Sequence, residues 1–262
     1  MKEGIVLITG GSGQLGRMFL RHSGDRYNLR LTYNSHPLEA LGHEVIQLDI
    51  TNYEDVLRAM QGVKSVVHFA ADSAGRGPWE SMLPNNIVGT YNVYEAARQA
   101  SVPRLIYASS NHAAGFAVKD GGPVLDAPVR PDSLYGVTKC FGEALGRFYH
   151  DAYGMQVICL RIGSCHGGDD LEDQRQRVHA AVKRGGSYPY NAQEYLSMWL
   201  HPEDMSQLVN KSLETNCPFG IFYGISANTP AAFDLAAAKH ELGYVPRYNV
   251  QDFFDESITS LT

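Results

Sequence analysis

The sequence predicts an α/β fold built on a doubly wound parallel sheet, with a small C-terminal cap. Short apolar runs rich in β-branched residues alternate with helical patterns over the first part of the chain, as expected of successive βαβ units. A glycine-rich turn directly follows the first of these runs. No repeat or Pro/Gly/Ser-rich linker divides the 262 residues, a length that suits one large domain. We therefore expect a single domain whose core is 1–162.

Six strands and four helices are expected in this core. The strands are Ile5–Thr9, Leu29–Tyr33, Glu44–Leu48, Ser65–Phe69, Arg104–Ala108 and Val157–Ile162. The helices are Gly13–His22, Tyr53–Met60, Asn86–Gln99 and Ser133–Tyr153. The last helix has the clearest boundaries, because Ser133 is a typical cap residue and Gly154 ends the helical pattern.

The regular pattern weakens after Ile162. The following segment is polar and rich in Gly, Asp and Arg, and it predicts loops with one short helix at Asp173–Arg184. From Leu196 apolar residues alternate again, and a helical stretch follows at Val250–Thr259. We expect 163–262 to form mostly substrate-binding elements, as a cap on the open edge of the sheet.

Composition excludes several classes of protein. With 22 Lys and Arg against 28 Asp and Glu, the net charge is −6, and no dense basic run points to nucleic acid as a partner. No apolar stretch approaches the roughly 18–20 residues of a membrane span, and the first apolar run is too short for a signal peptide. The four cysteines form no CxxC pair and the ten histidines no HxxxH pair. We expect a reduced, cytoplasmic protein without a metal site.

A glycine motif at the end of the first strand predicts a dinucleotide site. Gly10, Gly13 and Gly16 follow a strand and open a helix. In a Rossmann-like fold the first glycine permits a tight turn, the second lets the backbone approach a pyrophosphate, and the third packs helix on strand. The N-terminus of the helix offers free N–H groups to the phosphates. The motif therefore predicts NAD or NADP as the cofactor.

The choice between NAD and NADP stays open. The end of the second strand, around Tyr33, contains no carboxylate to bind the adenosine ribose, so a 2′-phosphate is not repelled there. Arg17 is placed either to reach such a phosphate or to lie solvated on the helix. Asp49 and Ile50 follow the third strand, where they would contact adenine, although Asp49 would serve equally well as a helix cap.

A tyrosine and a lysine spaced for proton transfer lie further along the chain. Tyr135 and Lys139 stand at positions i and i+4 of the predicted helix, and so on one face. A nearby ammonium lowers the pKa of a tyrosine, whose phenolate can then remove a proton from an alcohol. Ser109 and Ser110 leave a buried strand at the edge of the sheet where α/β proteins bind ligands.

Together these motifs resemble an extended short-chain dehydrogenase/reductase of the NAD-dependent epimerase/dehydratase family. The resemblance covers nearly the whole chain and is narrower for bacterial uronate dehydrogenases. Its most similar stretches are Asn86–Asn92, Ala108–His112, Arg130–Glu143, Arg161–Cys165 and Leu196–Trp199. Uronate dehydrogenases oxidise the anomeric hydroxyl of a hexuronic acid to a lactone and pass the hydride to a nicotinamide.

The resemblance implies a role for each matching residue. Ser110, Tyr135 and Lys139 would be the catalytic triad; Gly115 identifies Ser110 rather than Ser109 as its serine, because the family keeps a glycine five residues beyond it. The sugar would contact Ser73, Ser110, Asn111, His112, Tyr135 and Ser164. The cofactor would contact Gly10, Gly13, Gln14, Leu15, Gly16, Tyr33, Asp49, Ile50, Ala70, Ala71, Asn86, Tyr135, Lys139 and Ile162. From the residues alone, His112 fits a structural role too, and Ala70 and Ala71 fit the core.

The chain departs from uronate dehydrogenases where those enzymes bind the sugar carboxylate. They place an arginine just before the Leu-Ser-x-Trp stretch, whereas this chain has Glu194 there, which would repel a uronate. The preceding loop, Gly167–Ala192, is also longer than theirs. Cations in this loop could replace the missing arginine or bind a sugar phosphate. A cation in the loop after Ser73 is another candidate. These candidates are Arg76, Arg175, Arg177, Lys183 and Arg184, although most of these charges would equally well form a solvated helix face.

We expect an NAD(P)-dependent dehydrogenase that oxidises the C1 hydroxyl of a uronate or related aldose. The alternative within the fold is a nucleotide-sugar epimerase or dehydratase. Enzymes of that kind generally carry a larger C-terminal domain that holds the nucleotide, whereas only a short C-terminal part follows Lys139 here. A non-catalytic nucleotide-binding regulator would usually lack the tyrosine or the lysine. Family resemblance further predicts a homo-oligomer formed through the helices Asn86–Gln99 and Ser133–Tyr153.

Overall fold

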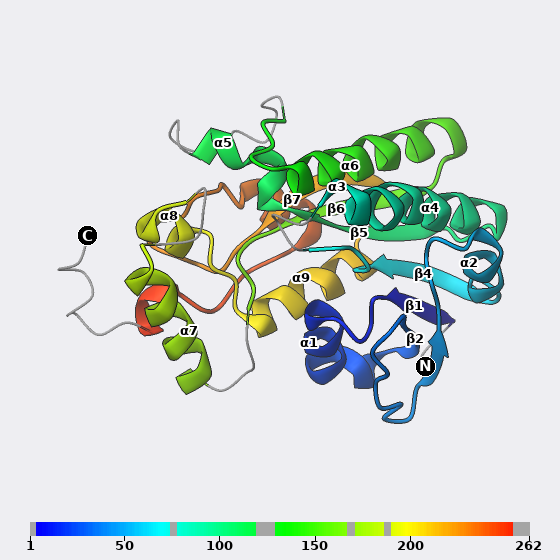
Figure 1. Ribbon diagram of the computed structural model, residues 1–262, viewed down its shortest axis with the longest axis horizontal. Helices are drawn as coiled ribbons and strands as arrows, with labels where there is room; N and C mark the ends of the chain where they lie inside the picture. The colour runs from blue at the N-terminus through cyan, green and yellow to red at the C-terminus, as the bar shows by residue number, and fades with distance from the viewer. Residues whose placement is uncertain (1–3, 74–77, 119–128, 167–170, 186–189, 254–262) are drawn as a thin grey trace.

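A computed structural model describes residues 4–73, 78–118, 129–166, 171–185 and 190–253. Seven parallel strands form one twisted sheet in the order β3-β2-β1-β4-β5-β6-β7 (Figure 1). The strands are β1 (Ile5–Thr9), β2 (Asn28–Tyr33), β3 (Glu44–Gln47), β4 (Val63–His68), β5 (Arg104–Ser110), β6 (Gln156–Ile162) and β7 (Phe219–Gly224). The helices are α1 (Gln14–Ser23), α2 (Tyr53–Ala59), α3 (Trp79–Met82), α4 (Gly89–Gln99), α5 (Gly115–Val118), α6 (Leu134–Tyr153), α7 (Leu171–Lys183), α8 (Ala192–Ser197) and α9 (Pro202–Glu214).

Helices cover both faces of the sheet, so the predicted doubly wound α/β fold is confirmed. Alternate residues of a strand point to opposite faces; in β1, Val6 and Ile8 pack on one face and Leu7 on the other. The first face is covered by α1 and α9, and the second by α2, α4 and α6. All six predicted strands are present in order, with bounds that differ by one or two residues at individual ends.

Helix α6 begins and ends where the sequence predicts. The Ser133 hydroxyl accepts a hydrogen bond from the Gly136 N–H at 3.1 Å, and Gly154 ends the helix with φ +69°. A β-carbon would be strained in that left-handed conformation. Helix α4, in contrast, begins at Gly89 rather than Asn86, because the turns from Leu83 to Val88 are wider and contain a proline near their start.

The C-terminal part of the chain differs most from expectation. Strand β7 pairs with β6 and extends the sheet, while α9 packs on the same face as α1. Part of the expected cap therefore completes the core layers instead. The remaining cap consists of α7, α8 and the segment after β7, joined by a small apolar cluster of Val178, Trp199, Val250 and Phe253.

Two short segments of this cap were predicted as helices. The predicted Asp173–Arg184 helix is present as α7. Residues Val250–Phe253 form a 3-10 turn, and the rest of the predicted Val250–Thr259 helix lies outside the described residues. Among the residues that the structure describes, no helix is long and apolar enough to cross a membrane.

Candidate active site

Two pockets at the carboxyl ends of the strands form one continuous groove. Both are lined by Gly10, Gly13, Phe69 and Ala71, and so they join at the glycine loop. One pocket runs along the ends of β5 and β6, the other along the ends of β2 and β3. Ligands of doubly wound proteins bind at this edge of the sheet.

The glycine loop is shaped to admit phosphates against backbone. Gly10 has φ +69°, and a β-carbon there would lie 2.7 Å from the Ala70 nitrogen. A β-carbon on Gly16 would lie 2.6 Å from the Gly10 oxygen, so this glycine lets α1 pack on the loop. Gly13 is the N-cap of α1 and has no side chain to cap the helix. The first turn also contains no acidic residue. Gln14 and Leu15 line the groove at this helix N-terminus, which fits the pyrophosphate of a dinucleotide.

The walls of the second pocket come mainly from the end of β2 and the turn after β3. Its lining includes Ser12, Thr32, Asn34, Ser35, His36, Leu48, Ile50, Ala70 and Ala71. Tyr33 is not part of this wall, because neighbouring residues of a strand point to opposite sides. The Asp49 carboxylate is engaged within its own turn, where it accepts hydrogen bonds from the Thr51 N–H at 2.9 Å and hydroxyl at 2.8 Å. Ile50 thus reaches the expected place, and the side chains of Tyr33 and Asp49 do not.

Two further residues near the cofactor groove hold its loops. Asn86 is buried, donates to the Asp72 carbonyl at 2.9 Å and accepts from the Asp72 N–H at 2.7 Å, and so fixes the segment after β4. It lies behind the groove rather than in its wall. The Arg17 guanidinium donates to the Ser12 carbonyl at 2.8 Å across the glycine loop. Ile162, in contrast, lines the groove as expected.

The three predicted catalytic residues meet in the first pocket. Ser110 ends β5, Tyr135 lies in the first turn of α6, and Lys139 follows one turn later. The Lys139 Nζ donates to the Ala108 carbonyl at 2.7 Å and lies 5.3 Å from the centre of the Tyr135 ring. This close approach of helix and strand requires Gly136, since a β-carbon there would clash with the His112 carbonyl.

Burial decides the proton affinities of the tyrosine and the lysine. It raises the pKa of Tyr135 well above its usual value; a hydrogen bond with Ser110 acts in the opposite direction, and the charge of Asp72 adds to the rise. Burial also lowers the pKa of Lys139 to about 7, opposed by the charge of Glu143. Burial thus outweighs the hydrogen bond with Ser110 at Tyr135, and the expectation that Lys139 lowers the pKa of Tyr135 stays a prediction.

The side chains expected around the sugar surround the same pocket. Ser73, Ser110, Asn111, His112, Tyr135 and Ser164 all line it. They come from the ends of β4, β5 and β6 and from the start of α6. Ser109 lines the pocket too, but its hydroxyl donates to the buried Glu143 carboxylate at 2.5 Å, which itself forms an ion pair with Arg161 at 2.8 Å.

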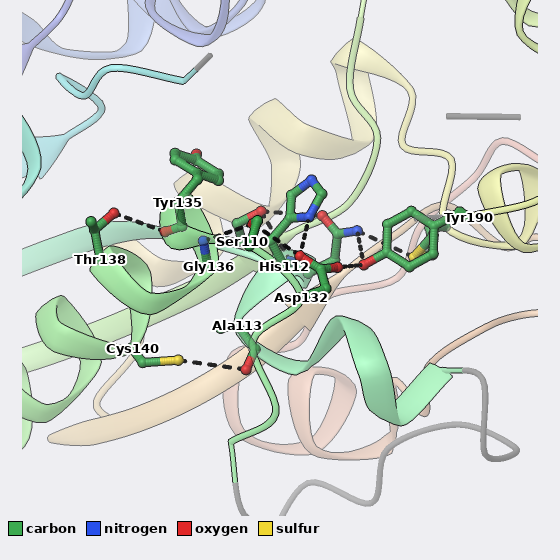
Figure 2. A network of polar contacts seen from close by, with 12 residues as sticks. Ser110, His112, Ala113, Asp132, Tyr135, Gly136, Thr138, Cys140 and Tyr190 are labelled. Atoms are coloured by element: carbon green, nitrogen blue, oxygen red, sulfur yellow. Dashed lines mark hydrogen bonds and ion pairs between the residues drawn. The ribbon is translucent and has the colours of Figure 1, made fainter. Parts of the chain in front are cut away.

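A hydrogen-bonded network next to the pocket contains two residues that the sequence did not single out. Asp132 accepts hydrogen bonds from the His112 ring at 2.8 Å and from the Tyr190 hydroxyl. Figure 2 shows the His112 ring between Tyr135 and Tyr190, next to this carboxylate. The only sequence signal for Asp132 was its position directly before Ser133, the cap of the predicted helix.

Gly115 makes room for this network. A side chain at this position would clash with the Asp132 carboxylate and with the Tyr190 hydroxyl. In this structure a glycine is therefore required at the position that identified Ser110, because any side chain would displace Asp132 or Tyr190.

Glu194 does not face the pocket. Its carboxylate accepts a hydrogen bond from the Asn191 N–H at 2.9 Å, while the Asn191 side chain accepts one from the Glu194 N–H, so the two residues cap α8. This capping explains the acid in a local way, although its charge still helps to raise the pKa of Tyr190 next to the pocket.

Helix α7 brings cations towards the pocket. Its Gln174 side chain donates to the carbonyl of His166, a pocket residue that sequence analysis missed. Burial lowers the pKa of His166, and the charges of Arg177 and His112 add to that effect. Arg177 also pairs with Asp173 at 2.9 Å on the exposed side of the helix. Arg76 lies outside the described residues.

Comparison with known proteins places this geometry in a family. The profile of the NAD dependent epimerase/dehydratase family matches residues 6–216. The chain belongs to this family. It is 34% identical to an NAD-dependent glucose-6-phosphate dehydrogenase of Haloferax volcanii over 95% of both chains, and 36% identical to a uronate dehydrogenase of Pseudomonas putida over 95% of this chain and 85% of that one.

Solved structures agree with this assignment. A uronate dehydrogenase of Agrobacterium tumefaciens, crystallised as a tyrosine-to-alanine mutant in complex with NAD, superposes with a TM-score of 0.81 at 32% identity, covering 98% of this chain and 89% of that one. The Rossmann-like fold of this epimerase/dehydratase family member is thus shared with an NAD-binding relative.

Proposed function

We propose that this protein is an NAD(P)-dependent dehydrogenase that oxidises the C1 hydroxyl of a sugar to the lactone. The observation that carries the proposal is the single groove that joins the glycine loop to Ser110, Tyr135 and Lys139. Relatives named as sugar dehydrogenases, matched over nearly the whole chain, support it. The substrate class that fits is a uronate or related aldose with a free C1 hydroxyl.

The residues of the pocket divide the reaction into positioning and proton removal. Ser110 holds the C1 oxygen by a hydrogen bond, and Tyr135 as phenolate removes the hydroxyl proton. Lys139, when protonated, stabilises that phenolate. A dinucleotide held along the glycine loop would supply the acceptor for the hydride from C1, while the protein supplies orientation and electrostatics. The products are the lactone, the reduced cofactor and one proton.

The test is reduction of the cofactor by the purified protein. NAD and NADP are each offered with galacturonate, glucuronate, neutral aldoses and sugar 6-phosphates. We expect turnover of at least one sugar class, and a loss of about 100-fold or more in the Tyr135→Phe variant, which retains the ring but not the hydroxyl. Undiminished oxidation by Tyr135→Phe would overturn the proposed chemistry.

The same experiment distinguishes the epimerase or dehydratase alternative, which the family description keeps open. Such an enzyme retains its nucleotide during purification and gives no net reduction of the cofactor. Release of the nucleotide after denaturation, together with no turnover in any combination, would favour this alternative.

We further propose that the protein forms a homo-oligomer through the neighbouring helices α4 and α6. These helices pack side by side and expose Tyr91, Val137, Phe148 and Tyr153. An apolar surface of this kind favours a partner, and a second copy would bury it. Light scattering should give at least twice the 28.9 kDa of one chain, and Phe148→Glu should shift the mass towards the monomer. A wild-type monomer would contradict this proposal.

We place the enzyme in the cytoplasm as a proposal. All four cysteines, Cys140, Cys159, Cys165 and Cys217, are free thiols in the structure, which suits a reducing compartment. Fractionation of cells that express the tagged protein tests this location.

A further inference from the structure

Asp132 is a buried carboxylate held next to the sugar pocket from three sides. Its side chain has no exposed surface. One oxygen, Oδ1, accepts hydrogen bonds from His112 Nδ1 at 2.8 Å and from the Ser133 hydroxyl at 3.0 Å. The other oxygen accepts a hydrogen bond from the Tyr190 hydroxyl. The Asp132 N–H also donates to the His112 carbonyl at 3.3 Å, so the two residues are linked through both backbone and side chain.

These contacts keep Asp132 ionised. Burial raises the pKa of this carboxyl, but the hydrogen bonds from His112, Tyr190 and Ser133 oppose it, and the pKa lies below its usual value. An ionised carboxylate can only accept hydrogen bonds. Nδ1 of His112 must therefore carry a hydrogen, and in the neutral imidazole Nε2 is then an acceptor.

The accepting nitrogen points away from Asp132. In Figure 2 the dashed line leaves the nitrogen next to Asp132, and the other ring nitrogen lies on the opposite side of the ring. The ring lies edge to face with Tyr135, with centres 5.8 Å apart, and His112 lines the pocket. Two side chains next to His112 already donate hydrogen bonds elsewhere. The Ser110 hydroxyl donates to Asn111 Oδ1 at 3.2 Å, and the Asn111 amide group donates towards the Met198 sulfur at 3.2 Å.

We propose that Asp132 is a positioning residue that selects the tautomer of His112, so that Nε2 accepts a hydrogen bond from a sugar hydroxyl and orients C1 towards Tyr135. This inference rests on the proposed function for its substrate. Tyr190, near the end of the insertion 167–192, and Gly115, which leaves space for the carboxylate, keep Asp132 in place. Through its hydroxyl group, this residue of the insertion thus contacts the carboxylate that holds His112.

The test combines a spectroscopic readout with kinetics. Asp132→Leu removes the acceptor at similar size, and ¹⁵N NMR of the imidazole nitrogens, assigned with a His112→Gln variant, reports the tautomer without any substrate. We expect hydrogen on Nδ1 in the wild type and a shift towards Nε2 in Asp132→Leu. We expect kcat/KM for the sugar to fall by roughly 10- to 100-fold, as for groups that orient metal-binding histidines, with the Kd of NAD unchanged.

Two further variants separate positioning from general damage. Tyr190→Phe removes one hydrogen bond of Asp132 but leaves its contact with His112, so it should keep the wild-type tautomer. In His112→Gln, adding Asp132→Leu should cause little further loss, because Asp132 acts through the ring. An unchanged tautomer in Asp132→Leu, or losses that multiply in the double variant, would overturn the inference. A shifted tautomer in a protein that oxidises no sugar would instead refute the proposed function.

Discussion

Tyr135 and Lys139 show at the scale of single residues how burial can oppose the effect of a neighbouring charge. The phenolate of Tyr135 is disfavoured because little solvent reaches it, and so is the ammonium of Lys139. A proton leaving this pair can come from either group, so a titration of the pair would belong to both. The hydrogen bond with Ser110 favours the phenolate.

The pH dependence of sugar oxidation should follow from this pair. A raised pKa means that less phenolate is present at neutral pH, so kcat/KM should increase as pH rises above 7. Lys139→Met removes the cation, and the rising limb should move to higher pH because the phenolate loses its partner. The measurement is kcat/KM against pH for both proteins, with Cys140→Ser on the same helix as control. A limb that stays in place would mean that Lys139 is already neutral during turnover.

At the scale of elements, α6 joins the catalytic residues to the sheet through a buried ion pair. Glu143 lies one turn after Lys139 and pairs with Arg161 of β6, whose side chain is 4% exposed, as is that of Glu143. Ser109 of β5 donates to the same carboxylate. The ion pair therefore fixes the register of α6 against β5 and β6, and with it the position of Tyr135.

Removing one partner of this pair should destabilise the fold. Glu143→Gln leaves the Arg161 charge buried without its counter-ion, so the free energy of unfolding should fall by about 3–5 kcal/mol. Urea denaturation measures it. The matched control is Asp151→Asn, which removes the exposed partner of Arg147 on the same helix and should cost no more than about 1 kcal/mol. Equal effects of the two variants would contradict the structural role of the buried pair.

Helix α7 contributes the charge of Arg177 to the surroundings of His166. Arg177 is close enough for its charge to lower the pKa of this pocket histidine, whereas Glu194 caps α8. If α7 supplies the cation for an anionic sugar, Arg177→Ala should raise KM about tenfold for uronates or sugar 6-phosphates and leave neutral aldoses unaffected. Arg175→Ala, an exposed cation of the same helix, is the control. Equal changes for charged and neutral sugars would exclude this role.

At the scale of the whole molecule, both cofactors should stabilise the fold. At 100 times its Kd, a dinucleotide adds about 2.7 kcal/mol, which corresponds to a rise in Tm of about 5–10 °C for a chain of this size. Ser35 lines the second pocket, at the ends of β2 and β3. The sequence around it has no carboxylate that would repel a 2′-phosphate. Ser35→Asp should therefore reduce the shift with NADP and preserve that with NAD. A wild-type protein stabilised by NAD alone would show that shape, rather than charge, selects the cofactor.

The sequence by itself determined the parallel sheet, the glycine loop and the meeting of Ser110, Tyr135 and Lys139. These features depend on local patterns: strands and helices alternate along the chain, and parallel strands end at one edge of the sheet. The limits of α6 were equally predictable, because its cap residues act on their own turns.

Only the tertiary structure decided which side chains face the groove and what their surroundings do to them. Tyr33 does not line the groove, Asp49 forms hydrogen bonds within its own turn, and Glu194 caps a helix. The tertiary structure also brought Asp132 and Tyr190, 58 positions apart, into contact, and added β7 to the sheet. Burial and contacts between distant segments govern hydrogen-bond partners and pKa values, and neither can be read from a local pattern of residues.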